Sequence, residues 1–165
     1  MKTMKLSHEV QGKELILRRE FDAPREKVFE AFSECEYLQQ WWGPRSWPVR
    51  YCTIEFHQGG VWHYCLQGPE HEDESWGKAV FKEIRKPEYI AFDDHFSDAE
   101  GNINHAMPTS FNEYRFAEEN GKTILDCRST YSSEEDVQKV MDLGAVDGIA
   151  ETFDRLDELL EKISK

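Results

Sequence analysis

The stretch VDGIAETFDRLDELL, residues 146–160, decides the fold of this 165-residue chain. Apolar side chains recur in it and just beyond it at alternating spacings of four and three residues: Ile149, Phe153, Leu156, Leu160 and Ile163. This spacing is typical of one face of an α-helix. It predicts a long amphipathic helix over 145–163 that packs against a sheet, with a break near Gly144 that separates it from a shorter preceding helix.

Residues 48–131 show the alternation of apolar and polar side chains that is typical of strands. Strands are expected at 13–21, 49–56, 61–67, 76–84, 88–96, 109–116 and 122–131. Short polar or glycine-containing turns separate most of them, so the six later strands form an antiparallel meander. One face of such a sheet must be covered, and only the C-terminal helix is long enough to cover it. The pattern predicts an α+β fold in a single domain over 1–165.

Two short helices are expected between the first and second strands. Residues 22–34 have helical spacing, and Ser33 and Glu36 form an S-x-x-E capping box that predicts the start of the second helix. Gly43 suits the position just after that helix. Ser132 and Glu135 form a similar box before the helix that precedes Gly144.

The composition restricts the partners of the protein. There are 33 acidic against 20 basic residues, a net charge of -13, so nucleic acid and anionic membrane surfaces are unfavourable partners. No apolar run approaches the roughly 18 residues of a membrane span. The N-terminal segment has no apolar core of a signal peptide, which predicts a cytoplasmic protein. The four cysteines form no C-x-x-C pair and are expected to be reduced and mostly buried: Cys35, Cys52, Cys65 and Cys127.

Three of the five tryptophans lie in QQWWGPRSWP, residues 39–48. Trp41 and Trp42 are adjacent, about 100° apart around a helix. We therefore expect one of them to pack against the sheet and the long helix and the other to lie nearer a cavity, and the sequence leaves open which. Trp47 is expected at the surface or at an edge.

These segments, in this order, resemble the family of activator of heat-shock-protein-90 ATPase homologues, within the START-like (SRPBCC, Bet v-like) helix-grip superfamily. The resemblance is carried by REFDAPREKVFEAFSE (19–34), WWGP (41–44), IEFHQGGVWHY (54–64), WGKAVFKEIRKPEYIAF (76–92) and VDGIAETFDRLDELL (146–160). It implies a curved antiparallel sheet of about six or seven strands wrapped around the C-terminal helix, with a cavity between them. The superfamily binds lipids, sterols, polyketides or plant phenolics in that cavity, and some members are cyclases.

Binding of a small hydrophobic or aromatic ligand, lipid-like or polyketide-like, is the function that this resemblance favours. A chaperone-activator-like protein-interaction domain is the first alternative, by analogy with the eukaryotic members of the family. A cyclase- or hydrolase-type enzyme that uses the same cavity is the second, although an activity is not the favoured interpretation. The residues expected to line the cavity are Trp41, Trp42, Trp62, Tyr64, Trp76, Phe92, Phe111, Glu113, Met141, Ile149 and Phe153.

Neither a metal, a cofactor nor a catalytic residue is assigned from the sequence. The six histidines show no HxH or HExxH spacing, and no nucleophile motif is present. Polar residues next to aromatics are the candidates for acid–base chemistry: Asp94 between two phenylalanines, and Glu113 two positions after Phe111. Glu113 would be desolvated if its face pointed inward. With the other face inward, Asn112, Tyr114 and Phe116 line the core and Glu113 lies in solvent.

Overall fold

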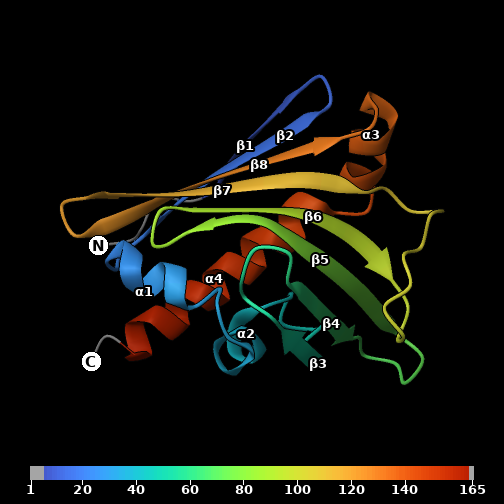
Figure 1. Cartoon of the computed structure of the whole chain (residues 1–165), viewed down its shortest axis with the longest axis horizontal. Coiled ribbons are helices and arrows are strands. Elements are labelled where there is room, and N and C mark those ends of the chain that lie inside the picture. Colours follow the sequence, from blue (N-terminus) through green and yellow to red (C-terminus); the bar gives the residue numbers. More distant parts are fainter. Residues whose placement is uncertain (1–5, 164–165) are drawn as a thin grey trace.

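One antiparallel sheet dominates the computed structural model, which describes residues 6–163 (Figure 1). Within this range it has eight strands in the order β1-β2-β8-β7-β6-β5-β4-β3. The strands are β1 (Ser7–Gln11), β2 (Glu14–Phe21), β3 (Val49–Ile54), β4 (Val61–Gln67), β5 (Glu74–Arg85), β6 (Tyr89–Ser97), β7 (Ser110–Glu119) and β8 (Lys122–Tyr131). The sheet is open and strongly curved, as the helix-grip fold requires.

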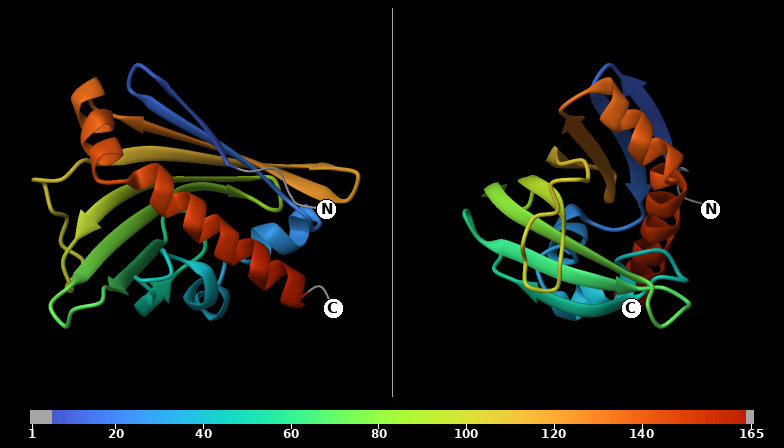
Figure 2. Two further views of the ribbon diagram at one scale, coloured as in Figure 1. Left: turned by 180° about the vertical axis from the view of Figure 1, so that it is seen from behind. Right: turned by 90° about the vertical axis from the view of Figure 1, so that its right-hand side faces the viewer.

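The concave face of the sheet is occupied by the C-terminal helix (Figure 2). The helices are α1 (Arg25–Glu30), α2 (Cys35–Trp41), α3 (Glu134–Asp142) and α4 (Ala145–Ile163). α1 and α2 follow β2, as expected. α3 ends before the predicted break at Gly144, whose φ is 83°, and α4 begins directly after it. Gly43 likewise ends α2 with a φ of 87°, a conformation that favours glycine. None of the helices in the described part of the chain is long and apolar enough to cross a membrane.

The predicted apolar stripe of α4 forms the centre of the core. Phe153, Leu156 and Leu160 are at most 1% exposed, and Phe153 meets Phe21 of β2 edge to face at 5.6 Å between ring centroids. Ile149 and Ile163 lie at the margins of the same core. At roughly 1.5–3 kcal/mol for each fully buried large apolar side chain, this stripe anchors the helix to the sheet.

Two local expectations differ from the structure. β1 was not expected because all five of its residues are exposed, so it has no buried face to produce an apolar alternation. The capping boxes were also misplaced. The Ser33 hydroxyl donates back to the Glu30 carbonyl at 2.7 Å and α2 has no side-chain cap, whereas Ser133, not Ser132, caps α3 by accepting from the Asp136 backbone N–H at 3.1 Å.

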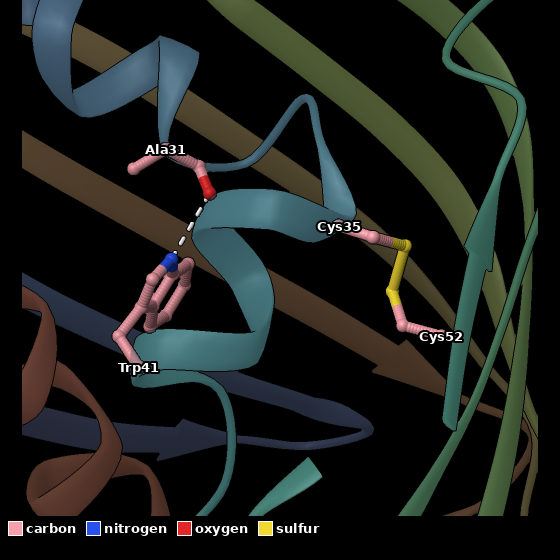
Figure 3. Close-up of a disulfide and its surroundings, with 4 residues drawn as sticks. All are labelled: Ala31, Cys35, Trp41 and Cys52. Atoms are coloured by element: carbon pink, nitrogen blue, oxygen red, sulfur yellow. Dashed lines mark hydrogen bonds between the residues drawn. A yellow bond between two sulfur atoms is a disulfide. The ribbon is translucent and has the colours of Figure 1, made fainter. Parts of the chain in front are cut away.

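A disulfide joins Cys35 at the start of α2 to Cys52 of β3 (Figure 3). The expectation that both thiols are reduced is therefore wrong. The two cysteines are separated by 17 positions, and only the packing of α2 against the edge strand brings their Cα atoms to 5.8 Å. Cys65 and Cys127 are free and buried, as predicted.

Candidate functional site

A cavity of about 290 Å³ lies between the concave face of the sheet and the junction of α3 with α4. Its apolar wall comes from β6, from the loop after it and from the two helices: Phe96, Pro108, Val140, Leu143 and Ala145. Its polar wall comes from four strands: Tyr64, Asp94, Ser110 and Tyr131, with Ser75 and His95 beside them. Leu143 is 62% exposed even though it borders the cavity, so an apolar side chain stands at the mouth.

The polar wall forms because three neighbouring strands place hydrogen-bonding side chains side by side. Asp94 of β6 pairs with Ser110 of β7, and Ser110 pairs with Tyr131 of β8. Directly paired residues project from the same face of a sheet, and adjacent strands are about 4.8 Å apart. The pairing therefore builds a row of one carboxyl and two hydroxyl groups across the floor of the cavity.

Tyr64 reaches the cavity because a glycine lies opposite it. It pairs with Gly77 of β5, and a Cβ atom at Gly77 would lie only 2.4 Å from Tyr64 Cζ. The absence of a side chain at this position lets the tyrosine ring lie across β5. A β-carbon there would displace the ring.

Hydrogen bonds behind the polar row hold it in place. Asn112 Nδ2 donates to Ser110 Oγ at 3.0 Å, and Ser129 Oγ donates to Asn112 Oδ1 at 2.5 Å. All three residues are buried. Buried polar groups that satisfy one another in this way are rigid, so Ser110 presents its hydroxyl in a defined position.

Burial raises the pKa of Asp94 to about 7, and a hydrogen bond from the His95 backbone N–H opposes this only partly. The negative charge of Asp94 in turn helps to raise the pKa values of three surrounding tyrosines, Tyr64, Tyr114 and Tyr131. Burial is the larger cause for each of them, and for Tyr131 the resulting pKa is about 12. Near neutral pH the carboxyl therefore exists in both protonation states, among hydroxyls that remain protonated.

The two adjacent tryptophans have different roles. Trp41 is fully buried, donates from Nε1 to the Ala31 carbonyl at 3.0 Å (Figure 3) and packs on Phe32 at 4.9 Å. Trp42 turns towards the strands, with its ring centroid 4.8 Å from Trp62 and 5.7 Å from Tyr64. Trp42, not Trp41, is thus the member of the pair that faces the interior of the sheet.

Arg155 of α4 holds Trp42 in this position. Its guanidinium group donates to the carbonyls of Gln40, Trp42 and Gly43 at 3.0, 3.2 and 2.8 Å. A cation at the C-terminal end of a helix satisfies carbonyls that have no intrahelical partner and interacts favourably with the helix dipole. The long helix is therefore tied to the WWGP segment through its backbone.

The structure brings some of the expected cavity residues together and separates others. Tyr64 and Trp76 border the 290 Å³ cavity. The Trp76 ring, however, packs against the His63 ring on the outer face of the sheet, with 5.0 Å between the ring centroids. A second void of about 10 Å³ is too small for a ligand and is bordered by Trp42, Trp62 and Phe92. Four further residues pack in the core or against it: Trp41, Met141, Ile149 and Phe153.

Phe111 and Glu113 lie on the outer face of the sheet, so the second of the two strand orientations is the one adopted. Phe111 is 37% exposed, and Glu113 accepts a hydrogen bond from the Tyr89 hydroxyl at 2.5 Å. Asn112, Tyr114 and Phe116 are buried on the inner face of the same strand. The sequence left both orientations open because β7 carries apolar side chains on both faces, so its own alternation does not identify the inner face.

Sequence reasoning missed several residues of the cavity: Gly77, Ser110, Tyr131, Val140 and Leu143. A signal existed for the two hydroxyl residues, since Ser110 and Tyr131 begin and end strands that flank a tight turn and so lie opposite each other. Within residues 6–163, no group of three or more His, Cys, Asp or Glu side chains could hold a metal ion.

Comparison with solved structures shows the same fold in several bacterial proteins. The crystal structure of protein Ms6760 from Mycobacterium smegmatis is 28% identical, with a TM-score of 0.86 over 96% of this chain and 97% of that one. A solution structure from Arthrobacter aurescens is 27% identical, with a TM-score of 0.88 over 98% and 93% of the two chains. A solution structure from Staphylococcus epidermidis is 30% identical, with a TM-score of 0.80 over 94% of each chain.

No curated protein matches the sequence. The family model described as "Activator of Hsp90 ATPase homolog 1-like protein" matches residues 22–161, from the loop before α1 almost to the end of α4. That match covers the strands, the break at Gly144 and the helix that together enclose the cavity. The chain therefore belongs to the family of activator of Hsp90 ATPase homolog 1-like proteins.

Proposed function

We propose that this protein binds a small molecule that is mainly apolar and has one polar end. The observation that carries the proposal is the 290 Å³ cavity, in which apolar side chains face a row of hydrogen-bonding groups. A largely apolar pocket with a few placed polar groups is the usual form of a small-molecule site, and its volume is at the lower end of the common range. The size favours a compact ligand of one or two rings over a sterol or a long-chain lipid.

Affinity in such a site comes mainly from removal of apolar surface from water, at roughly 25 cal/mol per Å². Phe96, Val140 and Leu143 offer that surface, while Asp94 and Tyr131 orient the polar end of the ligand. Because the polar groups are gathered on the sheet side, we expect the ligand to bind in one orientation.

A panel of short fatty acids, flavonoids, polyketide-like aromatics and small aromatic amines tests the proposal, with thermal shift and tryptophan fluorescence as readouts. Ser110→Phe places a ring in the cavity and is expected to abolish the response. Phe111→Trp enlarges the next side chain on the exposed outer face and is the matched control, expected to keep the response. Absence of any response from the native protein across the whole panel refutes the proposal.

The family match supports a second candidate, a protein-interaction domain that activates a chaperone of the heat-shock-protein-90 type. The net charge of -13 favours a basic patch on such a partner. The acidic residues at the first turn of α3 also have a local role, because negative charge stabilises a helix N-terminus. The ATPase rate of the bacterial chaperone, measured with and without this protein, decides: an unchanged rate and no complex reject the candidate.

A cyclase- or hydrolase-type activity in the same cavity is the weakest proposal. Among residues 6–163, Asp94 is the one carboxyl-bearing residue that borders the cavity, so Asp94→Asn is the variant for any assay that detects turnover.

A cytoplasmic location also stays a prediction. A disulfide persists more readily in an oxidising compartment. Alkylation of Cys35 and Cys52 in intact cells supports the prediction, and protection of both thiols opposes it.

A further inference from the structure

We infer that the cavity selects a ligand with a single positively charged amine, whose ammonium group pairs with the Asp94 carboxylate. This inference rests on the proposed function and names the chemical class of the ligand. The inference follows from the uncharged groups that surround Asp94 and from the absence of a cationic partner for its carboxylate among residues 6–163.

Asp94 has no cationic partner among residues 6–163. The residues that border the cavity include no lysine or arginine, and no ion pair in this part of the chain involves Asp94. Its neighbour Asp93 provides the contrast, because it points to the outer face and lies 3.2 Å from Lys82 Nζ. His95 also borders the cavity, but its Nδ1 lies 3.0 Å from Thr109 Oγ1 and burial lowers its pKa, so at pH 8 it carries no positive charge.

Neutral groups face Asp94 from every element packed around it. The titratable ones are three tyrosines whose pKa values are raised, Tyr64 from β4, Tyr114 from β7 and Tyr131 from β8, and His95 of β6, whose pKa is lowered by burial. On β5 the buried Ala79 lies directly opposite Asp94, and Gly77, Val140 of α3 and Ala145 at the start of α4 border the same cavity. Within residues 6–163 the protein therefore supplies the carboxyl group with a hydrogen bond from the His95 backbone N–H but with no opposite charge.

Asp94 is half-buried in the cavity wall, and a carboxylate that is partly removed from water and lacks a counter-ion is less favourable than one in solvent, so it gains from taking up either a proton or a cation. The first option is visible in the pKa of Asp94, which is raised to about 7. The second requires that the cation come from outside the protein. An ammonium group on the ligand stabilises the ionised carboxyl, whereas a ligand carboxylate is repelled and a ligand hydroxyl leaves the charge uncompensated.

Two further features favour a cation. The rings of Tyr64, Phe96 and Tyr131 border the same cavity, and the faces of aromatic rings attract cations. The net charge of -13 raises the local concentration of positively charged ligands and accelerates their association. One carboxyl on an otherwise largely apolar wall fits a monoamine with an aromatic or short alkyl body, and not a polyamine.

Three probes of matched size test the inference: 2-phenylethylamine, 2-phenylethanol and 3-phenylpropanoate, titrated by calorimetry at pH 8. We expect the amine to bind at least about tenfold more tightly than the alcohol, and the carboxylate to bind most weakly. This comparison uses the native protein, so it does not depend on the folding of a variant. Asp94→Asn is expected to remove the preference for the amine, and Asp93→Asn, on the opposite face of the same strand, to retain it.

The pH dependence gives an independent readout. Below the Asp94 pKa of about 7, the amine must displace a proton, so its affinity is expected to fall by about tenfold per pH unit. The affinity of the alcohol lacks this dependence. An alcohol that binds as tightly as the amine at pH 8, or an amine preference that survives Asp94→Asn, overturns the inference while cavity binding stands. If none of the three probes binds, the amine inference is refuted, and the wider panel above judges cavity binding separately.

Discussion

The disulfide between Cys35 and Cys52 is expected to contribute a large share of the stability of this protein. Its two cysteines are 17 positions apart. In the chain-entropy description, closing a loop of this length lowers the conformational entropy of the unfolded state, which stabilises the folded state by about 3 kcal/mol at 25 °C. For a chain of this size, 1 kcal/mol corresponds to about 2–4 °C in Tm, so loss of the bond is expected to lower Tm by about 6–12 °C.

The assay compares the Tm of the oxidised protein with that of the protein incubated with a phosphine reductant, with mass spectrometry to verify each state. The double variant Cys35→Ser/Cys52→Ser is the control. It should melt near the reduced protein and show no response to the reductant. If reduction of a verified disulfide leaves Tm unchanged, the argument from loop closure is refuted.

The bond also has a local consequence for the cavity wall. Cys52 pairs directly with Tyr64, and α2, which begins at Cys35, ends beside Trp42, whose ring packs on Tyr64. We therefore expect reduction to loosen β3 first, visible as faster hydrogen exchange in Val49–Ile54. Equal exchange in both redox states would show that the edge strand does not depend on the bond.

Three further predictions concern single residues. Gly77→Ala is expected to destabilise the protein by about 1–3 kcal/mol because its Cβ would lie 2.4 Å from Tyr64 Cζ. Gly148→Ala in α4 should stabilise it by up to about 1 kcal/mol, because the new Cβ would meet only Pro44 Cγ at 3.8 Å. Urea unfolding of both variants measures the difference. Trp41→Ala should cost about 3–5 kcal/mol in the same assay, and a cost below 1 kcal/mol would contradict its place in the core. The pKa of Asp94 rises from 3.8 to about 7 on folding, so the folded state binds this proton more tightly than the unfolded state does. The resulting contribution to the free energy of unfolding is largest below pH 4 and is lost as the pH rises through about 7. Asp94→Asn should therefore gain stability relative to the native protein between pH 4 and pH 8, and a stability difference that does not change with pH would refute the shift.

Much of the fold follows from local properties of the sequence. The spacing of Phe153, Leu156 and Leu160 depends only on the helical period and correctly predicts α4 over 145–163. Gly43 and Gly144 end helices because each adopts a positive φ, which is a property of a single residue. The positions of β2 to β8 could be predicted for the same reason, since alternation is visible within each of these segments, whereas the fully exposed β1 shows none.

The candidate site could be predicted only in part. The sequence placed Tyr64 near a cavity and put Asp94 between Phe92 and Phe96 on one strand face. It did not distinguish the two faces of β7, because Phe111 and Phe116 are large apolar residues on opposite sides. That choice was made by the pairing of β7 with β6, where the buried Phe92 lies opposite Asn112.

The sequence by itself thus determined the elements other than β1, their order and the face that α4 presents to the sheet, because helical and strand periods act over a few neighbouring residues. Tertiary structure alone decided which groups meet. The row from Asp94 through Ser110 to Tyr131 exists only because three strands pair in one register. The contact between Trp42 and Tyr64 and the bond between Cys35 and Cys52 exist only because α2 packs against the edge of a curved sheet. Register and curvature depend on contacts between residues far apart in the chain, and a local pattern carries no information about them.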